Sequence, residues 1–434
     1  MQARAVSKSR SLNRVRIDRE KGKQEGASRK KEEEREEKRA KKRRGPGNEI
    51  KAFSPPHLRI RKLSVDFTLV FIVAILVAFG LIVIYSSSSY IAALGKEADP
   101  AFYLKKQLIS VVVGFLMMII AAQVTREFYR GVAWPFYGFS VVMVLLVPII
   151  GVEINNAKRW IRIAGMSVQP AEFMKIAIIL VIASFIAKRG RRAMGTLEGV
   201  IPVFIISGIP AVMVWVLTSN LSSAIIIFGI AFLMLFVSSP TYKEYLILVG
   251  SGVAAIAGLA WYAKDHSLAF LGYRGTRIVS WLNPSADASG AGFQTLQALY
   301  AIGSGGLGGK GLGRSMQKLG FLPEAQNDMI FSIICEELGM IGAIAIMVLF
   351  LALIYKLVAI ATQTEDLFGM LIVTGVLSHL SLQVLLNIAV VTNTIPNTGI
   401  TLPFISYGGT AIICQLAEIG MVLGIERHPL KGNQ

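Results

Sequence analysis

The chain has 434 residues, of which 53% are hydrophobic and only 17% are charged, a balance that excludes an ordinary soluble domain. Its net charge is +18, but residues 1–62 carry +13 of this and the other 372 residues carry only +5. A basic segment in front of a membrane domain favours contact with anionic membrane lipids over nucleic-acid binding, so we expect no nucleic-acid partner.

The first segment, residues 1–65, is predicted to be a disordered basic cytoplasmic tail, because it is too highly charged to bury a core. A membrane domain is expected at residues 66–425. Residues 426–434 are expected to form a short cytoplasmic tail.

Apolar runs of about 20 residues recur along the membrane domain, and each is long enough to cross a bilayer core of about 30 Å as a helix. A backbone inside a bilayer must satisfy its own hydrogen bonds, so we predict an all-α polytopic membrane protein with about ten transmembrane helices. Their expected positions are residues 67–87, 106–124, 132–151, 171–188, 198–217, 220–238, 243–262, 329–355, 366–390 and 403–425. An even number places both termini on one side of the membrane, and the positive-inside rule assigns that side to the cytoplasm.

The loop before the fourth span contains Lys158, Arg159 and Trp160. Its basic residues lie on the predicted outer side, against the positive-inside rule, and anion binding is one reason for them to be there. Within the fourth span, Glu172 and Lys175 are three residues apart and share one helix face. They form either an internal ion pair or the lining of a polar cavity.

The longest predicted extracytoplasmic stretch, residues 263–328 between the seventh and eighth spans, includes Arg277, Gln294, Lys310 and Gln317. Loops of this length are commonly functional or disordered. Its glycine-rich part suggests a nucleotide-binding loop, but glycine follows the lysine where that motif requires Ser or Thr. We expect a flexible lid, a backbone anion site or a plain loop there instead.

Asp328 lies at the predicted water–membrane boundary, directly before the eighth span and four residues after Glu324. Partial desolvation at this boundary would raise the pKa of Asp328 and suit its carboxylate to accept a proton. The alternative is that Asn327 or Asp328 is an ordinary N-cap. Glu336 and Glu337 fall inside the span, where two carboxylates are costly, and a buried pair with a basic residue of another helix would explain them.

Between the ninth and tenth spans, residues 393–410 include Ser406 and contain three Pro or Gly interruptions up to the predicted start of the tenth span, at Pro396, Gly399 and Pro403. Such interruptions predict a re-entrant or broken segment. Gln383 and Asn387 are four residues apart in the ninth span and share one face beside this segment, a pattern that polar helix packing would also explain.

Cys335 and Cys414 fall within apolar runs, and the four histidines are scattered along the chain. We therefore predict no disulfide, no metal site and no cofactor. The sequence leaves open whether a divalent cation is required.

Four ordered groups of residues resemble the motifs of the SEDS family (shape, elongation, division and sporulation). The most specific is similar to the family signature Pro-x-Thr-Gly…Leu-Pro-Phe-x-Ser-Tyr-Gly-Gly. In this chain the motifs lie at residues 158–160 with 169–175, in the glycine-rich stretch ending at 317–319, at 322–339, and at 396–410. The chain departs from the family pattern in three places, with Asn220 for an acid, Gln326-Asn327 for His-Thr and Thr410 for Ser.

The resemblance implies a peptidoglycan glycosyltransferase that polymerises lipid II on the outer face of the cytoplasmic membrane, with undecaprenyl diphosphate as leaving group. It also implies a class B penicillin-binding protein as transpeptidase partner, and it places the family's acidic catalytic position on Asp328. Thr401 leans toward the division or sporulation branch (FtsW- or SpoVE-like). That branch implies septal cell-wall synthesis with other division proteins, and the RodA-like elongation branch is the alternative.

Our hypothesis is that Asp328 is the general base and that basic side chains hold the diphosphate. The candidate substrate-binding residues are Lys158, Arg159, Trp160, Glu172, Lys175, Arg277, Gln294, Lys310, Gln317, Glu324 and Ser406. Two other functions remain open on the residues alone, a lipid II flippase or other transporter and a catalytically silent scaffold.

Overall fold

The computed structural model describes residues 67–95, 98–154, 157–163, 166–243, 273–287, 290 and 292–427, together with isolated positions between 245 and 261. The predicted tail at 1–65, most of the predicted tail at 426–434 and most of the predicted span at 243–262 lie outside the described residues. The chain divides into two units, Met1–Lys62 and Leu63–Gln434, and the second contains every element named below.

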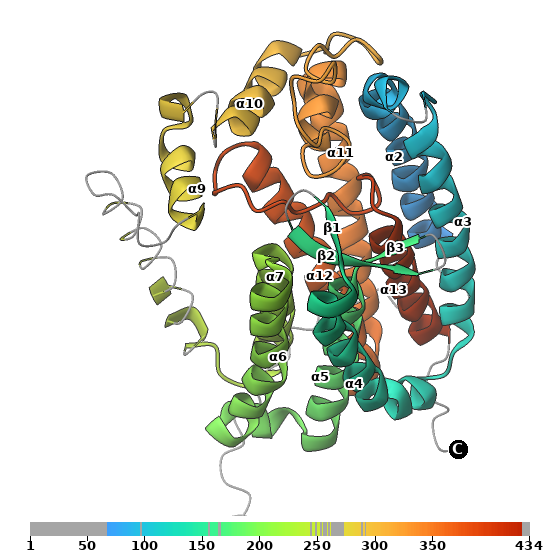
Figure 1. The fold of residues 1–434 in the computed structure, drawn as a ribbon. Coiled ribbons are helices and arrows are strands. Elements are labelled where there is room, and N and C mark those ends of the chain that lie inside the picture. Colours follow the sequence, from blue (N-terminus) through green and yellow to red (C-terminus); the bar gives the residue numbers. More distant parts are fainter. Residues whose placement is uncertain are drawn as a thin grey trace, which may run out of the picture. The chain divides into compact units, whose positions relative to one another are not determined.

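Within the described ranges, nine helices are long and apolar enough to cross a membrane. They are α2 (Phe67–Leu94), α3 (Phe102–Gln123), α4 (Arg126–Ile150), α5 (Pro170–Arg189), α6 (Leu197–Thr218), α7 (Leu221–Ser238), α11 (Ile330–Gln363), α12 (Leu367–Val391) and α13 (Gly409–Arg427). Shorter helices are η1 (Arg191–Gly195), α9 (Tyr273–Leu282), η3 (Pro284–Asp287) and α10 (Phe293–Gly305). Figure 1 shows the long helices running roughly along one direction, and the predicted polytopic helical fold is confirmed.

A small antiparallel sheet joins α4 to α5, a feature that the all-α prediction lacked. Its strands are β1 (Val152–Ile154), β2 (Ala157–Ile163) and β3 (Met166–Val168), in the order β1-β2-β3. Trp160 pairs with Val152, and Arg162 pairs with Ser167. Ile161 of β2 is buried while its neighbour Arg162 is exposed, so the alternation of side chains along the strand anchors the hairpin to the helices.

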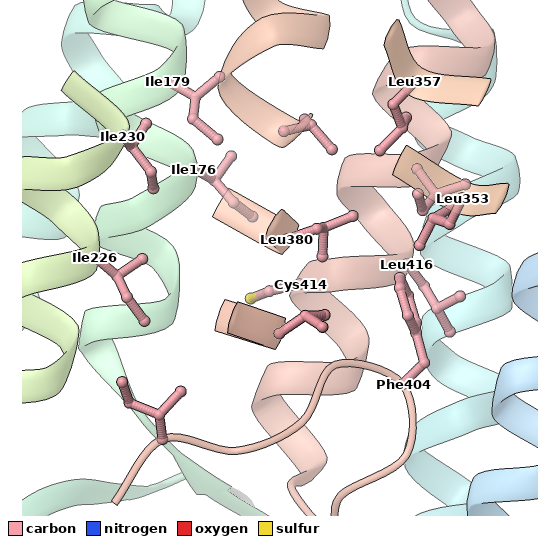
Figure 2. Close-up of a cluster of buried hydrophobic side chains, with 14 of the residues drawn as sticks. Ile176, Ile179, Ile226, Ile230, Leu353, Leu357, Leu380, Phe404, Cys414 and Leu416 are labelled. Atoms are coloured by element: carbon pink, nitrogen blue, oxygen red, sulfur yellow. The ribbon is translucent and has the colours of Figure 1, made fainter. Parts of the chain in front are cut away.

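The centre of the bundle is formed by α5, α7 and α12. Isoleucines of α5 and α7 face Leu380 of α12 in a continuous apolar cluster (Figure 2). By contrast, α3 and α4 expose many large apolar side chains, as expected for helices that face lipid. The helix α13 packs closely on α3, because a Cβ added at Gly420 would lie only 2.3 Å from the backbone oxygen of Met118.

The helix α11 is broken at Gly339, whose φ of 66° and ψ of −166° are not helical. The glycine-rich loop, residues 306–318, supplies partners to the backbone groups that the break releases. Before the break, the carbonyl oxygens of Glu336 and Glu337 accept bonds of 2.9 Å from loop N–H groups. After it, the N–H of Met340 donates to the carbonyl oxygen of Gly306 at 2.9 Å. The backbone inside the helix bundle is therefore satisfied despite the break.

Residues 393–408 form a non-helical segment between α12 and α13, which we call the roof segment. The predicted interruption is present, but the predicted tenth span began at 403 and α13 begins only at Gly409. The difference arises because Phe404 adopts a φ of 62°, which a helix cannot contain.

Replacing Gly305 with alanine is expected to destabilise the protein by about 1–3 kcal/mol, the usual cost of forced overpacking. A Cβ at this position would lie 1.9 Å from the carbonyl oxygen of Cys335, where α10 meets α11. Gly303→Ala is the matched control, since no atom lies within 4 Å of its added Cβ. Thermal unfolding in detergent should show a lower midpoint for Gly305→Ala alone, and equal midpoints for the two variants would contradict the close approach.

Candidate active site

Asp328 lies directly before α11 and is buried, with 9% of its surface exposed. Its backbone carbonyl accepts a bond of 2.8 Å from the side-chain amide of Asn387 on α12. The same amide also donates to the carbonyl oxygen of Ile400 at 2.6 Å, so one fully buried side chain joins the Asp328 backbone to the roof segment. The N-cap of α11 is Met329, and neither Asp328 nor Asn327 caps the helix, so the alternative prediction of an ordinary N-cap is wrong.

One oxygen of the Asp328 carboxylate is unsatisfied. Its Oδ1 atom is buried and has no hydrogen-bond partner among the described residues. Its Oδ2 atom lies 3.7 Å from the position of a Cβ added to Gly399, so the roof segment passes over the carboxylate. Burial, and next the negative charge of Glu324, raise the pKa of Asp328 to about 7, while hydrogen bonds from the backbone N–H groups of Asp328 and Met329 and the charge of Arg277 act in the opposite direction. A carboxylate poised near neutral pH can both accept and release a proton.

Side chains from the stretch between α7 and α11 hold the first part of the roof segment. Arg277 donates to the carbonyl oxygen of Asn397 at 2.8 Å. The Asn397 side chain donates to Gln294 at 2.9 Å, and Gln294 also donates to the carbonyl oxygen of Pro323 at 3.4 Å. The structure therefore brings three predicted site residues, Arg277, Gln294 and Glu324, to the surroundings of Asp328.

The inner part of the roof segment is bonded to the residues just before Asp328. The Ser406 hydroxyl donates to the carbonyl oxygen of Asn327 at 2.6 Å and accepts from the N–H of Leu402 at 2.8 Å. The N–H of Tyr407 donates to the carbonyl oxygen of Gln326 at 2.9 Å. Ser406 thus shapes the roof, although its hydroxyl is already occupied on both sides.

The basic residues of β2 lie at the ends of α6 and α7. The Arg159 guanidinium donates to the carbonyl oxygen of Ser219 at 2.8 Å, and Ser222, three residues later, donates to the carbonyl oxygen of Thr398 in the roof segment. Lys158 is exposed and Trp160 is half-buried. Of these residues, the exposed Lys158 is the cation that an anionic ligand can reach directly.

Glu172 and Lys175 form the predicted internal ion pair, with Lys175 Nζ 2.7 Å from Glu172 Oε1 and both side chains buried. Cys414 of α13 lies close enough to feel the charge of each. The pair therefore belongs to the centre of the bundle, and among the two open interpretations the structure favours the ion pair.

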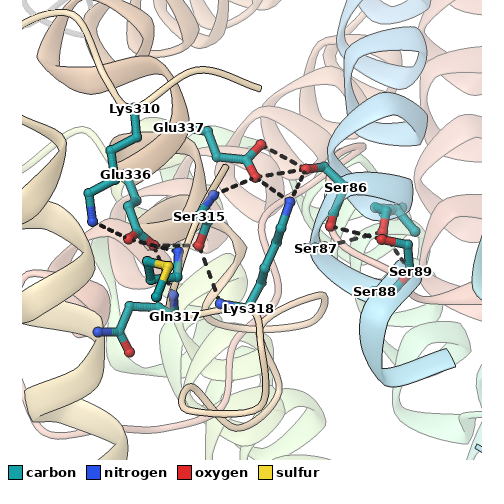
Figure 3. A network of polar contacts seen from close by, with 12 residues as sticks. Ser86, Ser87, Ser88, Ser89, Lys310, Ser315, Gln317, Lys318, Glu336 and Glu337 are labelled. Carbon is teal, nitrogen blue, oxygen red and sulfur yellow. Dashed lines mark hydrogen bonds and ion pairs between the residues drawn. The ribbon is translucent and has the colours of Figure 1, made fainter. Parts of the chain in front are cut away.

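Lys310 and Gln317 belong to a second polar network, around Glu336 and Glu337 (Figure 3). Lys310 Nζ lies 2.7 Å from Glu336 Oε1, and Lys318 Nζ lies 2.8 Å from Glu337 Oε1. The backbone N–H of Gln317 donates to Glu336 at 3.3 Å. The sequence analysis expected the basic partners of the two glutamates to come from another helix. They come instead from the glycine-rich loop.

Ser86 of α2 completes this network, and the sequence analysis missed it. Its hydroxyl lies 2.7 and 2.8 Å from the two carboxylate oxygens of Glu337 and 3.0 Å from Lys318 Nζ. The signal in the sequence is a run of four serines, residues 86–89, inside an otherwise apolar span. Through Ser86 the network joins α2, α11 and the glycine-rich loop.

Comparisons with known proteins agree with this architecture. The family model described as cell cycle protein FtsW/RodA/SpoVE matches residues 67–431. Stage V sporulation protein E of Bacillus subtilis is 36% identical over 372 residues, which cover 85% of this chain and 98% of that protein. A "Probable peptidoglycan glycosyltransferase FtsW" of Geobacter sp. strain M18 is 35% identical, covering 83% of this chain and 96% of that protein.

Two solved structures share the fold. A chain from a study of how a peptidoglycan synthase complex coordinates polymerization and crosslinking superposes with a TM-score of 0.68 at 25% identity, covering 84% of this chain and 98% of that chain. A variant of the Thermus thermophilus rod shape determining protein RodA gives a TM-score of 0.62 at 26% identity, covering 85% of this chain and 100% of that chain.

Replacing Lys318 with methionine is expected to lower the unfolding free energy by about 3–5 kcal/mol, because Glu337 would stay buried without its counter-ion. Lys105→Met is the matched control, since Lys105 pairs with Asp99 at the surface and its side chain is 67% exposed. Thermal unfolding of both variants in detergent is the measurement. The assignment fails if the two variants unfold at the same temperature.

Proposed function

This chain belongs to the FtsW/RodA/SpoVE family of cell cycle proteins, and on that premise we propose that it is a peptidoglycan glycosyltransferase with Asp328 as its general base. The substrate would be lipid II, polymerised into glycan strands on the outer face of the cytoplasmic membrane. The observation that supports this role best is a buried carboxylate with an unpartnered oxygen and a pKa of about 7, bordered by the roof segment.

In the proposed reaction, Asp328 accepts the proton of the sugar 4-hydroxyl while the hydroxyl oxygen forms a bond to the anomeric carbon of the other substrate. The bond from that carbon to the diphosphate oxygen breaks, and undecaprenyl diphosphate leaves with the bonding electrons. Positive charge must stabilise the departing diphosphate. Arg159, Arg277 and the exposed Lys158 are the cations suited to this task, with arginine favoured for bidentate contact.

Lys310 is better assigned a structural role than a diphosphate contact. Its ammonium forms an ion pair with Glu336, whose side chain is fully buried. Diverting this ammonium to a substrate would leave the buried carboxylate without its cation, which is costly. For the same reason we do not propose Lys175 as a substrate contact, because it is paired with the buried Glu172.

Access to Asp328 requires the roof segment to move. Gly399 lies next to the carboxylate and is itself exposed, so only a thin layer of chain separates Asp328 from the outside. A shift of residues 397–399 would open the carboxylate to a sugar hydroxyl. Closure would then exclude water, as lids do in other transferases.

The protein is a multi-pass membrane protein, and we place both termini in the cytoplasm. The basic residues Lys188, Arg189, Arg191 and Arg192 lie at or just after the end of α5 opposite to its Pro170 end. At the Pro170 end, the N–H of Gln169 donates to Thr410, two residues after the roof segment. The positive-inside rule puts the arginine-rich end in the cytoplasm and therefore puts Asp328 outside.

A class B penicillin-binding protein is the partner we propose, because the matching synthase complex couples polymerization to crosslinking. A role in septal synthesis alongside other division proteins is favoured by the relatives named FtsW and stage V sporulation protein E, which are 35–36% identical. The RodA structure, at 26%, is less similar in sequence.

Asp328→Asn is expected to lower the rate of glycan synthesis by about 10²–10⁴-fold, because it removes the general base. The assay is gel analysis of labelled lipid II polymerised by the purified protein with its partner. Asp99→Asn, at an exposed ion pair, is the control and should stay active. Wild-type rates from a folded Asp328→Asn protein would rule out the assignment, and lost lipid II transfer across vesicles with retained synthesis would indicate a flippase.

The pH dependence of polymerisation should follow the charge of Asp328. Since the base must be ionised and its pKa is about 7, the rate should rise with pH through about 7 and then level off. Glu324→Gln removes a negative charge and lowers the pKa of Asp328, so the rise should move to lower pH by up to about one unit. Arg277→Gln removes a positive charge and should move it to higher pH. If both variants moved the rise in rate to the same side in pH, the two side chains would not act on Asp328 through their charges.

A further inference from the structure

The buried carboxylates inside the described membrane-spanning helices are paired with lysines, with one exception. Glu172 is paired with Lys175, Glu336 with Lys310 and Glu337 with Lys318, at distances of 2.7–2.8 Å. Each of these partners is a lysine. The exception is Glu418 of α13, whose recorded partner is a histidine.

Glu418 and His379 are both fully buried in the membrane-spanning helices α13 and α12. His379 Nδ1 lies 2.8 Å from Glu418 Oε2 and 3.0 Å from Oε1. The other ring nitrogen, Nε2, has no hydrogen-bond partner among the described residues. Contact between the ring and the carboxylate therefore depends on Nδ1 alone.

The groups packed around this pair supply no spare positive charge. The charged groups that act on Cys414, near this pair on α13, are Glu172, Glu418 and Lys175. Lys175 is already bonded to Glu172. The sequence of α7, on the other face of α12, contains no charged residue. With a neutral imidazole, the cluster would keep one uncompensated negative charge inside the membrane, which is costly.

We infer that His379 and Glu418 share one proton in the membrane interior, in addition to the N–H of a neutral imidazole ring. This shared proton bonds α12 to α13, and we call the pair a latch. Either the ring is an imidazolium facing a carboxylate, or the proton lies on the carboxyl group and bonds the ring. Both arrangements remove the net charge and connect the two helices.

The latch lies below the roof segment, on the face of α12 that holds it. His379, Gln383 and Asn387 are spaced four residues apart and share one helix face. Gln383 donates to Thr401 at 3.1 Å, and Asn387 donates both to Ile400 and to the backbone of Asp328.

The helix α13 holds the other end of the roof segment in the same way. Gln415 accepts a bond of 3.0 Å from the N–H of Phe404, and Glu418 follows one turn later. The roof segment is thus suspended between two helices that His379 and Glu418 tie together. On the proposed function, the pair acts as positioning residues for Asp328.

The test compares His379→Gln, Glu418→Gln and the double variant in the full-length protein. His379→Gln leaves Glu418 without a proton-sharing partner, so it should lower the thermal unfolding midpoint more than Glu418→Gln, which removes the charge. The double variant should recover most of the loss, because charge and partner are removed together. Glu365→Gln, at an exposed carboxylate before α12, is the control and should unfold like the wild type.

Infrared spectroscopy follows the proton itself. In His379→Gln the proton should move to Glu418 and produce a carboxylic-acid C=O band that the double variant lacks. Additive losses in unfolding midpoint, or a His379→Gln protein without this band, would overturn the shared proton. If His379→Gln fails to fold, Glu418→Gln decides. A folded Glu418→Gln protein supports the shared proton, whereas a Glu418→Gln protein that also fails to fold would show that the contact matters and the charge does not.

A polymerisation assay tests separately whether the latch positions Asp328. His379→Gln should lower the turnover number at least tenfold, leave the half-saturating lipid II concentration unchanged, and regain activity within about threefold of wild type in the double variant. Coupled unfolding midpoints with unchanged turnover would overturn the positioning role. A wild-type protein that makes no glycan would refute the proposed function and leave the unfolding and infrared results as an independent test of the latch.

Discussion

A bilayer offers no water to a broken helix, and the structure around Asp328 depends on how the break in α11 is satisfied. The glycine-rich loop provides the missing partners on both sides of Gly339, and close backbone approach explains why Gly305, Gly309 and Gly339 are needed there. Because that loop is fixed on α11, its two lysines are placed on the buried glutamates 336 and 337. The chain then continues into the residues that carry Asp328, so the start of α11 has a defined position.

Asp328 differs from every other buried carboxylate that the structure describes, because the others each have a basic side chain as partner. Glutamates 172, 336 and 337 have ammonium partners, and Glu418 has His379. Asp328 has no ion-pair partner among the described residues, and the negative charge of Glu324 affects its pKa more than the positive charge of Arg277. A protein that elsewhere neutralises its buried acids has left this one poised near neutral pH, as general acid–base chemistry requires.

The helix α12 connects these features across the membrane. Its first turn is capped by Asp366, which also lies 3.7 Å from the guanidinium of Arg126. Its middle carries His379, and its last turns carry Asn387, which bonds both to Asp328 and to the roof segment. A movement of α12 would therefore act directly on the backbone of Asp328.

The sequence by itself determined the membrane fold and the interruption before α13, and it singled out Asp328 as a candidate site residue. Hydropathy, Pro and Gly positions and ordered motifs are local patterns, and they survive without knowledge of the tertiary structure. Only the tertiary structure decided the partners of the charged residues. Lys310 was expected to meet a diphosphate and instead neutralises Glu336, while His379 and Glu418 were never connected. Such pairs join residues 26 and 39 positions apart in the chain, and only helix packing brings them within 3 Å. The β1–β3 sheet was missed for a related reason, because its short strands gain their hydrogen bonds from each other rather than from a recognisable local pattern.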